Sequence, residues 1–131
     1  MKKCGIINSE ISKVLSDLGH TDSICIGDCG LPVPDGVKKI DLALKLGEPS
    51  FIEVLKLIDE DMYVEKIILA EEIKTKNPTQ LENIKKIYNN IDTEYVPHDE
   101  FKKKTKNVKA IIRTGEASPY SNIILISKVC F

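Results

Sequence analysis

The chain has 131 residues, of which 42% are hydrophobic and 30% charged, the composition of an ordinary globular protein. Its 19 basic and 20 acidic residues nearly balance, which argues against a nucleic-acid or membrane-surface partner, because both require a basic excess. We find neither a membrane-spanning apolar run nor a signal-peptide pattern. We therefore expect one cytoplasmic domain over residues 1–131, with its four cysteines reduced.

The first predicted helix precedes the most irregular stretch of the chain. Apolar residues recur at i, i+3, i+4 and i+7 from Ile11 on, a stripe typical of an amphipathic helix. Asn8 or the serine after it can cap the start, and Gly19 ends the pattern as a C′ glycine does. His20, one of only two histidines, follows directly.

The remaining chain alternates between strand and helix patterns. Pro49 precedes one helical pattern, Asn77 with Pro78 and Gln80 marks a second with a capping-box partner, and Pro97 precedes a third. Apolar runs predict strands at 24–26, 39–44, 66–70, 93–96, 108–112 and 123–129. This alternation predicts an α/β fold, with a central, largely parallel sheet flanked by helices.

Three polar segments follow predicted strand ends or lie at helix termini, namely 20–28, 97–102 and 113–122. Ligands of α/β sheets bind beyond the carboxyl ends of the strands. We therefore expect a functional site to be built from these segments.

Two of these segments carry the only histidines, and histidine titrates near neutral pH when unperturbed, so proton transfer is assigned first to His20 or His98. Asp28 can orient and charge-stabilise a nearby imidazole. Simpler roles fit the same residues equally well. Asp28 can be a turn former next to Gly27, His20 a helix-terminal cap and His98 a loop histidine.

The third segment contains the sequence PYSN. Tyr120 and Asn122 alternate around Ser121, so in an extended chain both would face the same side. A phenol and an amide offer the donors and acceptors that a polyol needs. A strand-start or interface role for these residues is equally consistent with the pattern.

Other kinds of site match the sequence less well. Four side chains are zinc-type ligands: His20, Cys25, Cys29 and His98. The Cys25–Cys29 spacing lacks the compact CxxC knuckle, and no second cysteine pair follows. The stretch 27–36 matches neither phosphate-loop motif, and no base lies near the cysteines in sequence to activate them.

Several motifs together resemble the ribose pyranase and fucose mutarotase family. They are GHTD at 19–22, GLPVPDGV at 30–37, PHDEF at 97–101, IRTGE at 112–116 and PYSN at 119–122. Each motif alone is a weak signal, but the combination is highly specific. The similarity covers nearly the whole chain and is least distinctive over 78–92.

The resemblance implies a role for each matched residue. The proton donor of the family falls on His20, which we expect Asp28 to hold and charge-stabilise. The sugar contacts of the family fall on Asp28, His98, Tyr120, Ser121 and Asn122. The chain departs from the family pattern at Cys4 and Cys29, and neither is one of these positions.

The resemblance also implies an activity. It is that of an isomerase that interconverts the pyranose and furanose forms of D-ribose by acid and base catalysis, with no cofactor and no metal. It further implies a ring-shaped homo-oligomer, a homodecamer, with sites at subunit boundaries. Two alternatives stay open: a mutarotase of fucose or another aldose, and a non-catalytic sugar-binding accessory of a transport system.

Overall fold

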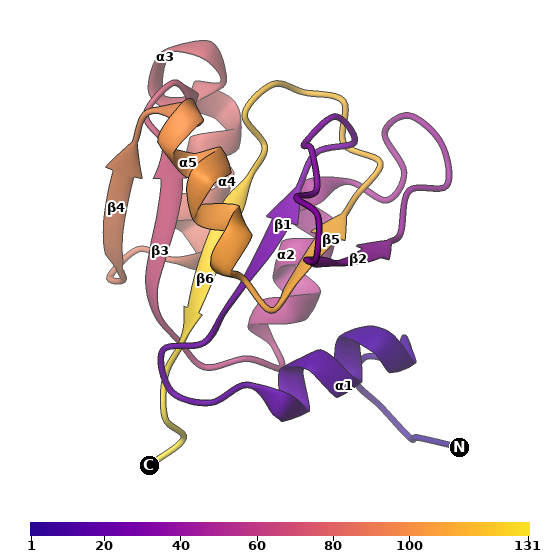
Figure 1. The fold of residues 1–131 in the computed structure, drawn as a ribbon. Helices are drawn as coiled ribbons and strands as arrows, with labels where there is room; N and C mark the ends of the chain where they lie inside the picture. Colours follow the sequence, from indigo (N-terminus) through magenta and orange to yellow (C-terminus); the bar gives the residue numbers. More distant parts are fainter.

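One six-stranded sheet organises the structure, a computed structural model that describes residues 1–131 (Figure 1). The strands are β1 (Ser23–Gly27), β2 (Lys38–Asp41), β3 (Val64–Ala70), β4 (Asp92–Val96), β5 (Ala110–Arg113) and β6 (Ile123–Ser127). The helices are α1 (Ser9–Asp17), α2 (Phe51–Asp59), α3 (Ile73–Lys76), α4 (Pro78–Ile87) and α5 (His98–Lys104), followed by a 3-10 turn, Thr105–Asn107. None of these helices combines the length and apolar surface that a bilayer crossing requires.

The strands lie in the order β2-β5-β1-β6-β3-β4, and every pairing is parallel except those of β6. The other five strands therefore end at one edge of the sheet, called here the carboxyl edge, and begin at the opposite amino edge. Because β6 starts at the carboxyl edge, the segment before it joins the loops that follow the parallel strands. The predicted α/β class with a largely parallel sheet is confirmed.

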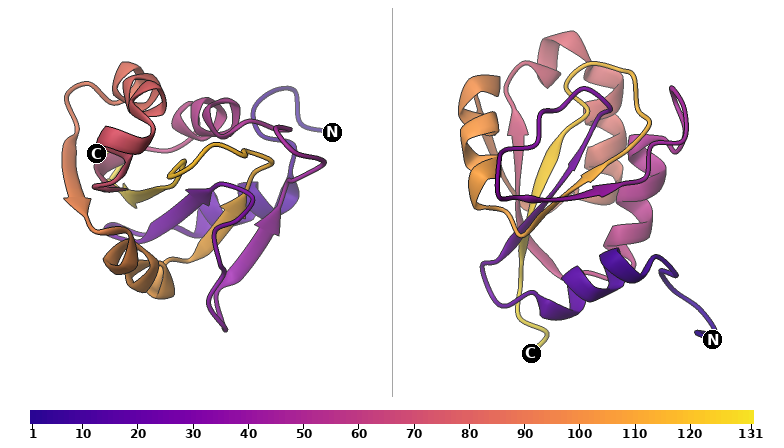
Figure 2. Two further views of the ribbon diagram at one scale, coloured as in Figure 1. Left: turned by 90° about the horizontal axis from the view of Figure 1, so that it is seen from above. Right: turned by 45° about the vertical axis from the view of Figure 1, so that its right-hand side comes forward.

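Helices cover both faces of the sheet. α2 and α4 cover one face, α5 covers the other, and α1 lies across the amino edge near both termini (Figures 1 and 2). Successive residues of β1 alternate between the two faces. Ile24 and Ile26 pack in the larger core, while Cys25 packs with Phe101 in the smaller one, and all are fully buried. Burying one such aliphatic side chain contributes about 1.5–3 kcal/mol.

Side-chain caps start two helices where the sequence predicts them. Asn8 Oδ1 accepts hydrogen bonds from two backbone N–H groups of the first turn of α1, both at 3.0 Å. Asn77 Oδ1 accepts one from the Gln80 backbone at 3.3 Å, at the start of α4. The predicted capping box is only half formed, because the Asn77 N–H donates to the Ile73 carbonyl at 3.1 Å, while Gln80 Oε1 accepts from Asn83 Nδ2 at 3.3 Å.

Other local predictions are wrong in part. Gly19 does lie at C′, directly after the C-cap Leu18, but it is not left-handed, and the positive φ of this turn, 68°, belongs to Thr21. β2 ends at Asp41, short of the predicted residue 44, because the Asp41 carboxylate accepts from the Ala43 N–H and turns the chain. β6 ends two residues early, and the one-turn helix α3 was not predicted.

Candidate functional site

A reciprocal hydrogen-bonded pair occupies the middle of the carboxyl edge. Asp28 follows β1 and Asn122 precedes β6, so the pairing of these two strands brings them together. The Asp28 N–H donates to Asn122 Oδ1 at 3.0 Å, and Asn122 Nδ2 donates back to Asp28 Oδ2 at 2.9 Å. The other carboxylate oxygen of Asp28 accepts from the Gly30 N–H at 2.9 Å. Asp28 therefore has a local turn role and also an oriented, partly exposed carboxylate.

An aromatic cluster lies beside this pair. His98 begins α5, and its backbone N–H donates to both carboxylate oxygens of Glu72, at 3.1 and 3.0 Å. Its ring stacks near Phe101, with centroids 6.2 Å apart, and meets the Tyr120 ring edge-on at 5.2 Å. His98 Nδ1 is buried and has no hydrogen-bond partner in the protein. A buried polar atom without a partner is available to a ligand.

The PYSN turn joins the pair and the cluster. Tyr120 has a positive φ of 57°, a left-handed conformation that costs a non-glycine residue about 1–2 kcal/mol. The fully buried Ser121 faces inward, where its hydroxyl accepts from Gln80 Nε2 at 3.0 Å and lies 2.8 Å from Ser118 Oγ. Tyr120 contacts His98 and Asn122 contacts Asp28, but this segment is a turn and not the extended chain on which the predicted alternation depended. The Ser121 hydroxyl is thus engaged within the protein, and its predicted sugar contact stays a prediction.

His20 lies at the amino edge, away from this group. It precedes β1, whereas Asp28 follows β1, and five residues of strand separate the two by about 15 Å. Within one protomer Asp28 therefore does not hold His20, and this expectation is wrong because eight residues in sequence include a whole extended strand. The partner of His20 is Glu65, whose Oε2 lies 3.0 Å from His20 Nε2.

The turn that carries His20 is held by its backbone. The Thr21 N–H donates to the Ser127 carbonyl at 3.1 Å, and the Ser127 N–H donates to the Asp22 carbonyl at 2.8 Å. The Asp22 carboxylate accepts from the Gly19 N–H at 2.9 Å and pairs with Lys109 at 3.3 Å. The Gly19 bond is the main reason that the pKa of Asp22 lies below its ordinary value. Thr21 is β-branched, so its positive φ is a strained conformation that these bonds maintain.

An open hollow of about 320 Å³ adjoins His20. The end of α1, Met62, Tyr63 and the C-terminal segment 127–131 line it. The side chains of Tyr63 and Phe131 are 67% and 99% exposed, so two aromatic rings stand free beside the histidine. Free apolar rings next to a polar group are typical of interaction surfaces.

Glu116 organises the loop that leads to the PYSN turn, and sequence reasoning missed it. Its Oε1 accepts from the Ala117 and Ser118 N–H groups at 3.1 Å, and its Oε2 accepts from the Phe51 N–H at 3.2 Å, at the start of α2. Partial burial by itself raises the pKa of Glu116, but the hydrogen bonds from Ser118 and Phe51 outweigh it and hold the pKa below the ordinary value. An acid in a predicted loop carries no sequence signal for such a role.

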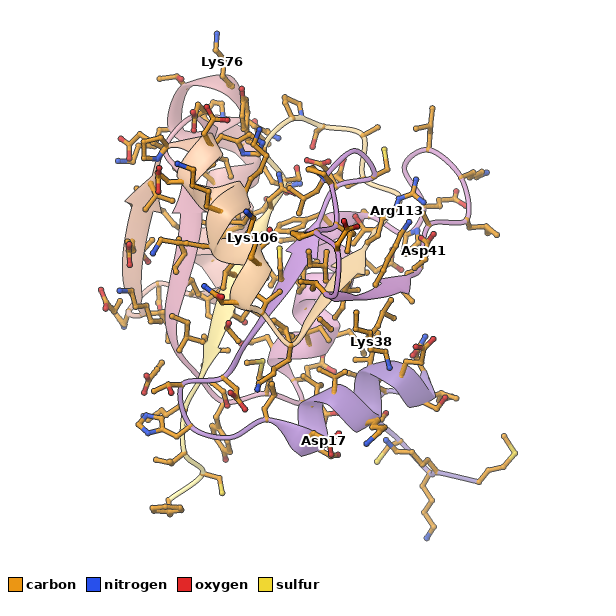
Figure 3. The ribbon with its side chains drawn as sticks, in the orientation of Figure 1. Asp17, Lys38, Asp41, Lys76, Lys106 and Arg113 are labelled. Atoms are coloured by element: carbon orange, nitrogen blue, oxygen red, sulfur yellow. The ribbon has the colours of Figure 1, made fainter.

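Arg113 closes the other side of the carboxyl edge. Its guanidinium points toward Asp41 (Figure 3), with Nη1 3.0 Å from Oδ2, while Nε donates to the Cys29 carbonyl at 3.1 Å. The same side chain thus connects the end of β5, the end of β2 and the loop after Asp28.

The other kinds of site considered from the sequence find no support in the geometry. No three His, Cys, Asp or Glu side chains lie close enough together to hold a metal ion. Cys25 is fully buried, which, with a smaller effect of the Asp28 charge, raises the pKa of its thiol far above the ordinary value. Such a thiol is not a nucleophile.

Comparison with known proteins gives consistent matches over the full length. A model of the RbsD / FucU transport protein family matches residues 1–130. The D-ribose pyranase of Bacillus cytotoxicus is 57% identical over 131 residues, all of both chains, and that of Streptococcus agalactiae serotype Ia is 59% identical over 130 residues, 98% of each. The structure of Bacillus subtilis RbsD complexed with D-ribose has 52% identity and a TM-score of 0.98 over all of both chains. The fucose mutarotase of Streptococcus pneumoniae, in complex with L-fucose, has 25% identity and a TM-score of 0.82 over 95% of each chain.

Proposed function

The chain belongs to the RbsD / FucU family, and from this premise we propose that it acts as a D-ribose pyranase. It is an isomerase that interconverts the pyranose and furanose forms of D-ribose. The choice of sugar rests on sequence identity. The chain is 52–59% identical to the two D-ribose pyranases and to Bacillus subtilis RbsD, but only 25% identical to the fucose mutarotase. We further propose that the reaction takes place in the cytosol and supplies ribofuranose for ribose catabolism.

The reaction needs proton transfer and no redox step. Opening the ring requires a proton on the ring oxygen and removal of one from the anomeric hydroxyl. Reclosure through another hydroxyl repeats both transfers at new atoms. One well-placed histidine accelerates such a step by about 10²–10⁴-fold. In our proposal His20 is this acid, and the mechanism uses no cofactor.

The carboxyl edge supplies the sugar contacts in this proposal. The oriented carboxylate of Asp28 accepts hydroxyl protons and is the base for the anomeric hydroxyl. The free Nδ1 of His98 and the phenol of Tyr120 bind further hydroxyls, and Asn122 keeps the carboxylate in place. These contacts retain the open-chain sugar until it closes again.

A single protomer does not complete this site. A general acid must lie within about 3 Å of the atom it protonates, but β1 separates His20 from Asp28 by about 15 Å. We therefore infer that His20 of a second copy reaches the carboxyl edge of the first. The exposed rings of Tyr63 and Phe131 beside His20 support a contact between copies there. The ring-shaped homodecamer implied by the resemblance fits this requirement.

Ring exchange of D-ribose, followed by NMR magnetisation transfer, tests the proposal. We expect the wild-type protein to accelerate exchange and His20→Ala to lose about 10²–10⁴-fold of that acceleration. Equal acceleration by both would overturn the role of His20. Binding of D-ribose without any acceleration by the wild type would instead support the sugar-binding accessory. L-Fucose, run in parallel, tests the choice of sugar.

Light scattering on the same samples tests the shared site. A monomer that retains full activity would contradict it.

A further inference from the structure

The His20 side chain makes one hydrogen bond in the structure. Its Nε2 lies 3.0 Å from Glu65 Oε2, and the two side chains are 51% and 35% exposed. This contact uses one ring nitrogen and leaves Nδ1 free. Which nitrogen of a histidine carries its mobile proton is set by the hydrogen bond that the other nitrogen makes.

Glu65 reaches His20 because β3 is irregular at this residue. In the pairing with β6, Val64 lies opposite Ser127 and Lys66 lies opposite Ile126, so Glu65 is an extra residue between two successive pairs. Such a bulge re-aims a side chain, and bulges are frequent next to active sites.

The same strand end also holds the backbone of His20. The Ser127 carbonyl, opposite Val64 in the sheet, accepts from the N–H of Thr21. One short segment of β6 thus positions both the turn that carries the imidazole and the bulge that carries the carboxylate. The strained φ of Thr21 is consistent with a turn held for function.

We propose that Glu65 is the positioning residue of His20 and that Nδ1 is the nitrogen that transfers the proton. This inference rests on the proposed function of His20. Glu65 accepts the Nε2–H bond, which fixes the tautomer and the ring orientation and presents Nδ1 to the sugar. A carboxylate bound to the distal nitrogen of a catalytic histidine acts in this way in other enzymes.

The proton balance of the opening step follows directly. His20 enters the step protonated on both ring nitrogens. Its Nδ1–H bond breaks and the ring oxygen gains that proton as the bond between C1 and the ring oxygen breaks, which leaves the neutral Nε2–H form bound to Glu65. The O–H electron pair of the anomeric hydroxyl forms the carbonyl, and its proton passes to the Asp28 carboxylate of the other copy. In closure another hydroxyl attacks C1 and gives its proton to Nδ1 of His20, while the carbonyl oxygen takes the proton back from Asp28, so both groups return to their starting states.

Other charged groups surround His20 but do not contact it. Asp61 and Lys128 lie on the hollow beside it, with Tyr63, Cys130 and the C-terminal residue, and Asp22 is engaged with Gly19 and Lys109. Asp61 offers a negative charge near the imidazole without a hydrogen bond to it. Asp61→Asn is therefore a matched control, because it removes a charge from the same surface and leaves the Glu65 contact intact.

The test combines kinetics with long-range ¹H–¹⁵N NMR of the histidines in the assembled protein. There are only two histidines, so His98 serves as an internal reference. Glu65→Ala should lower kcat by about 10- to 100-fold, as loss of an orienting partner of histidine typically does, and leave KM for D-ribose unchanged. It should also change neutral His20 from the Nε2–H tautomer to a mixture of the Nε2–H and Nδ1–H tautomers. Glu65→Gln, which keeps an acceptor for Nε2–H, should retain the tautomer and lose less activity.

The outcomes separate this inference from the proposed function. If Glu65→Ala keeps the wild-type kcat and the wild-type tautomer while His20→Ala is inactive, the role of Glu65 is overturned and that of His20 is kept. An active His20→Ala would overturn the proton-donor assignment itself. An equal loss in Asp61→Asn would show that surface charge, and not the Glu65 hydrogen bond, governs the reaction. Light scattering of each variant verifies that the assembly is retained.

Discussion

The two edges of the sheet carry their polar groups in opposite ways. At the carboxyl edge Ser121 and Asn122 are at most 1% exposed, and Asp28, His98 and Tyr120 are partly buried. At the amino edge His20 is half exposed and makes one hydrogen bond, to Glu65. The contrast teaches a division of roles. In our proposal one edge holds the polyol within its own protomer, while the other presents a proton donor outward, to a second copy.

Mixing two inactive variants is the strongest test of this difference between the two edges. Alone, His20→Ala and Asp28→Asn should each lose about 10²–10⁴-fold of the acceleration. If every site takes His20 from one copy and Asp28 from another, random co-assembly restores about one site in four. NMR exchange measured after unfolding and refolding the mixture gives the answer. No recovery in verified mixed assemblies would mean that both groups act within one protomer.

Asn122→Ala should affect stability as well as binding. It leaves the N–H and one carboxylate oxygen of Asp28 without their partner, and the expected cost is about 1–3 kcal/mol in the free energy of unfolding. D-ribose affinity should fall with it. Glu65→Ala is the matched change at the amino edge, where an exposed ion pair contributes only about 0–1 kcal/mol. Urea unfolding and calorimetric titration measure both quantities, and equal stability losses would contradict the proposed difference between the edges.

Glu116→Gln gives the smallest of these effects, and it depends on pH. The pKa of Glu116 is lowered in the folded protein, so its stabilising contribution is fully present above the ordinary value of 4.5 and is lost as the pH falls through the lower folded value. The wild type should therefore lose more stability than the variant on acidification below 4.5. Unfolding free energies across that range test this, with Glu82→Gln as the control at an exposed helix position. Parallel curves for wild type and Glu116→Gln would count against it.

Local sequence patterns predicted the elements but not how distant ones meet. The cap at Asn8 and the apolar spacing of α1 are determined within a few residues, so they were predictable. The partner of His20 was not, because Asp28 is near in sequence and Glu65 is near in space. Glu65 is also placed by a bulge in the β3–β6 pairing, which no property of residues 64–66 alone indicates. The hydrogen bond from Gln80 Nε2 to Ser121 Oγ was likewise not predictable, because it joins α4 to the PYSN turn 41 residues away in sequence.

Strand β6 has a consequence for how copies can associate. It begins directly after Asn122 at one edge and ends at Ser127 at the other, so in our proposal each subunit carries a receptor, the sugar contacts, at one end and a donor, His20, at the other. Two unlike ends favour heterologous, head-to-tail contacts. An open row of such subunits leaves one receptor and one donor unmatched at its ends, whereas a closed ring matches all of them. In our proposal, every sugar site therefore has a His20 donor only when the assembly is a closed ring.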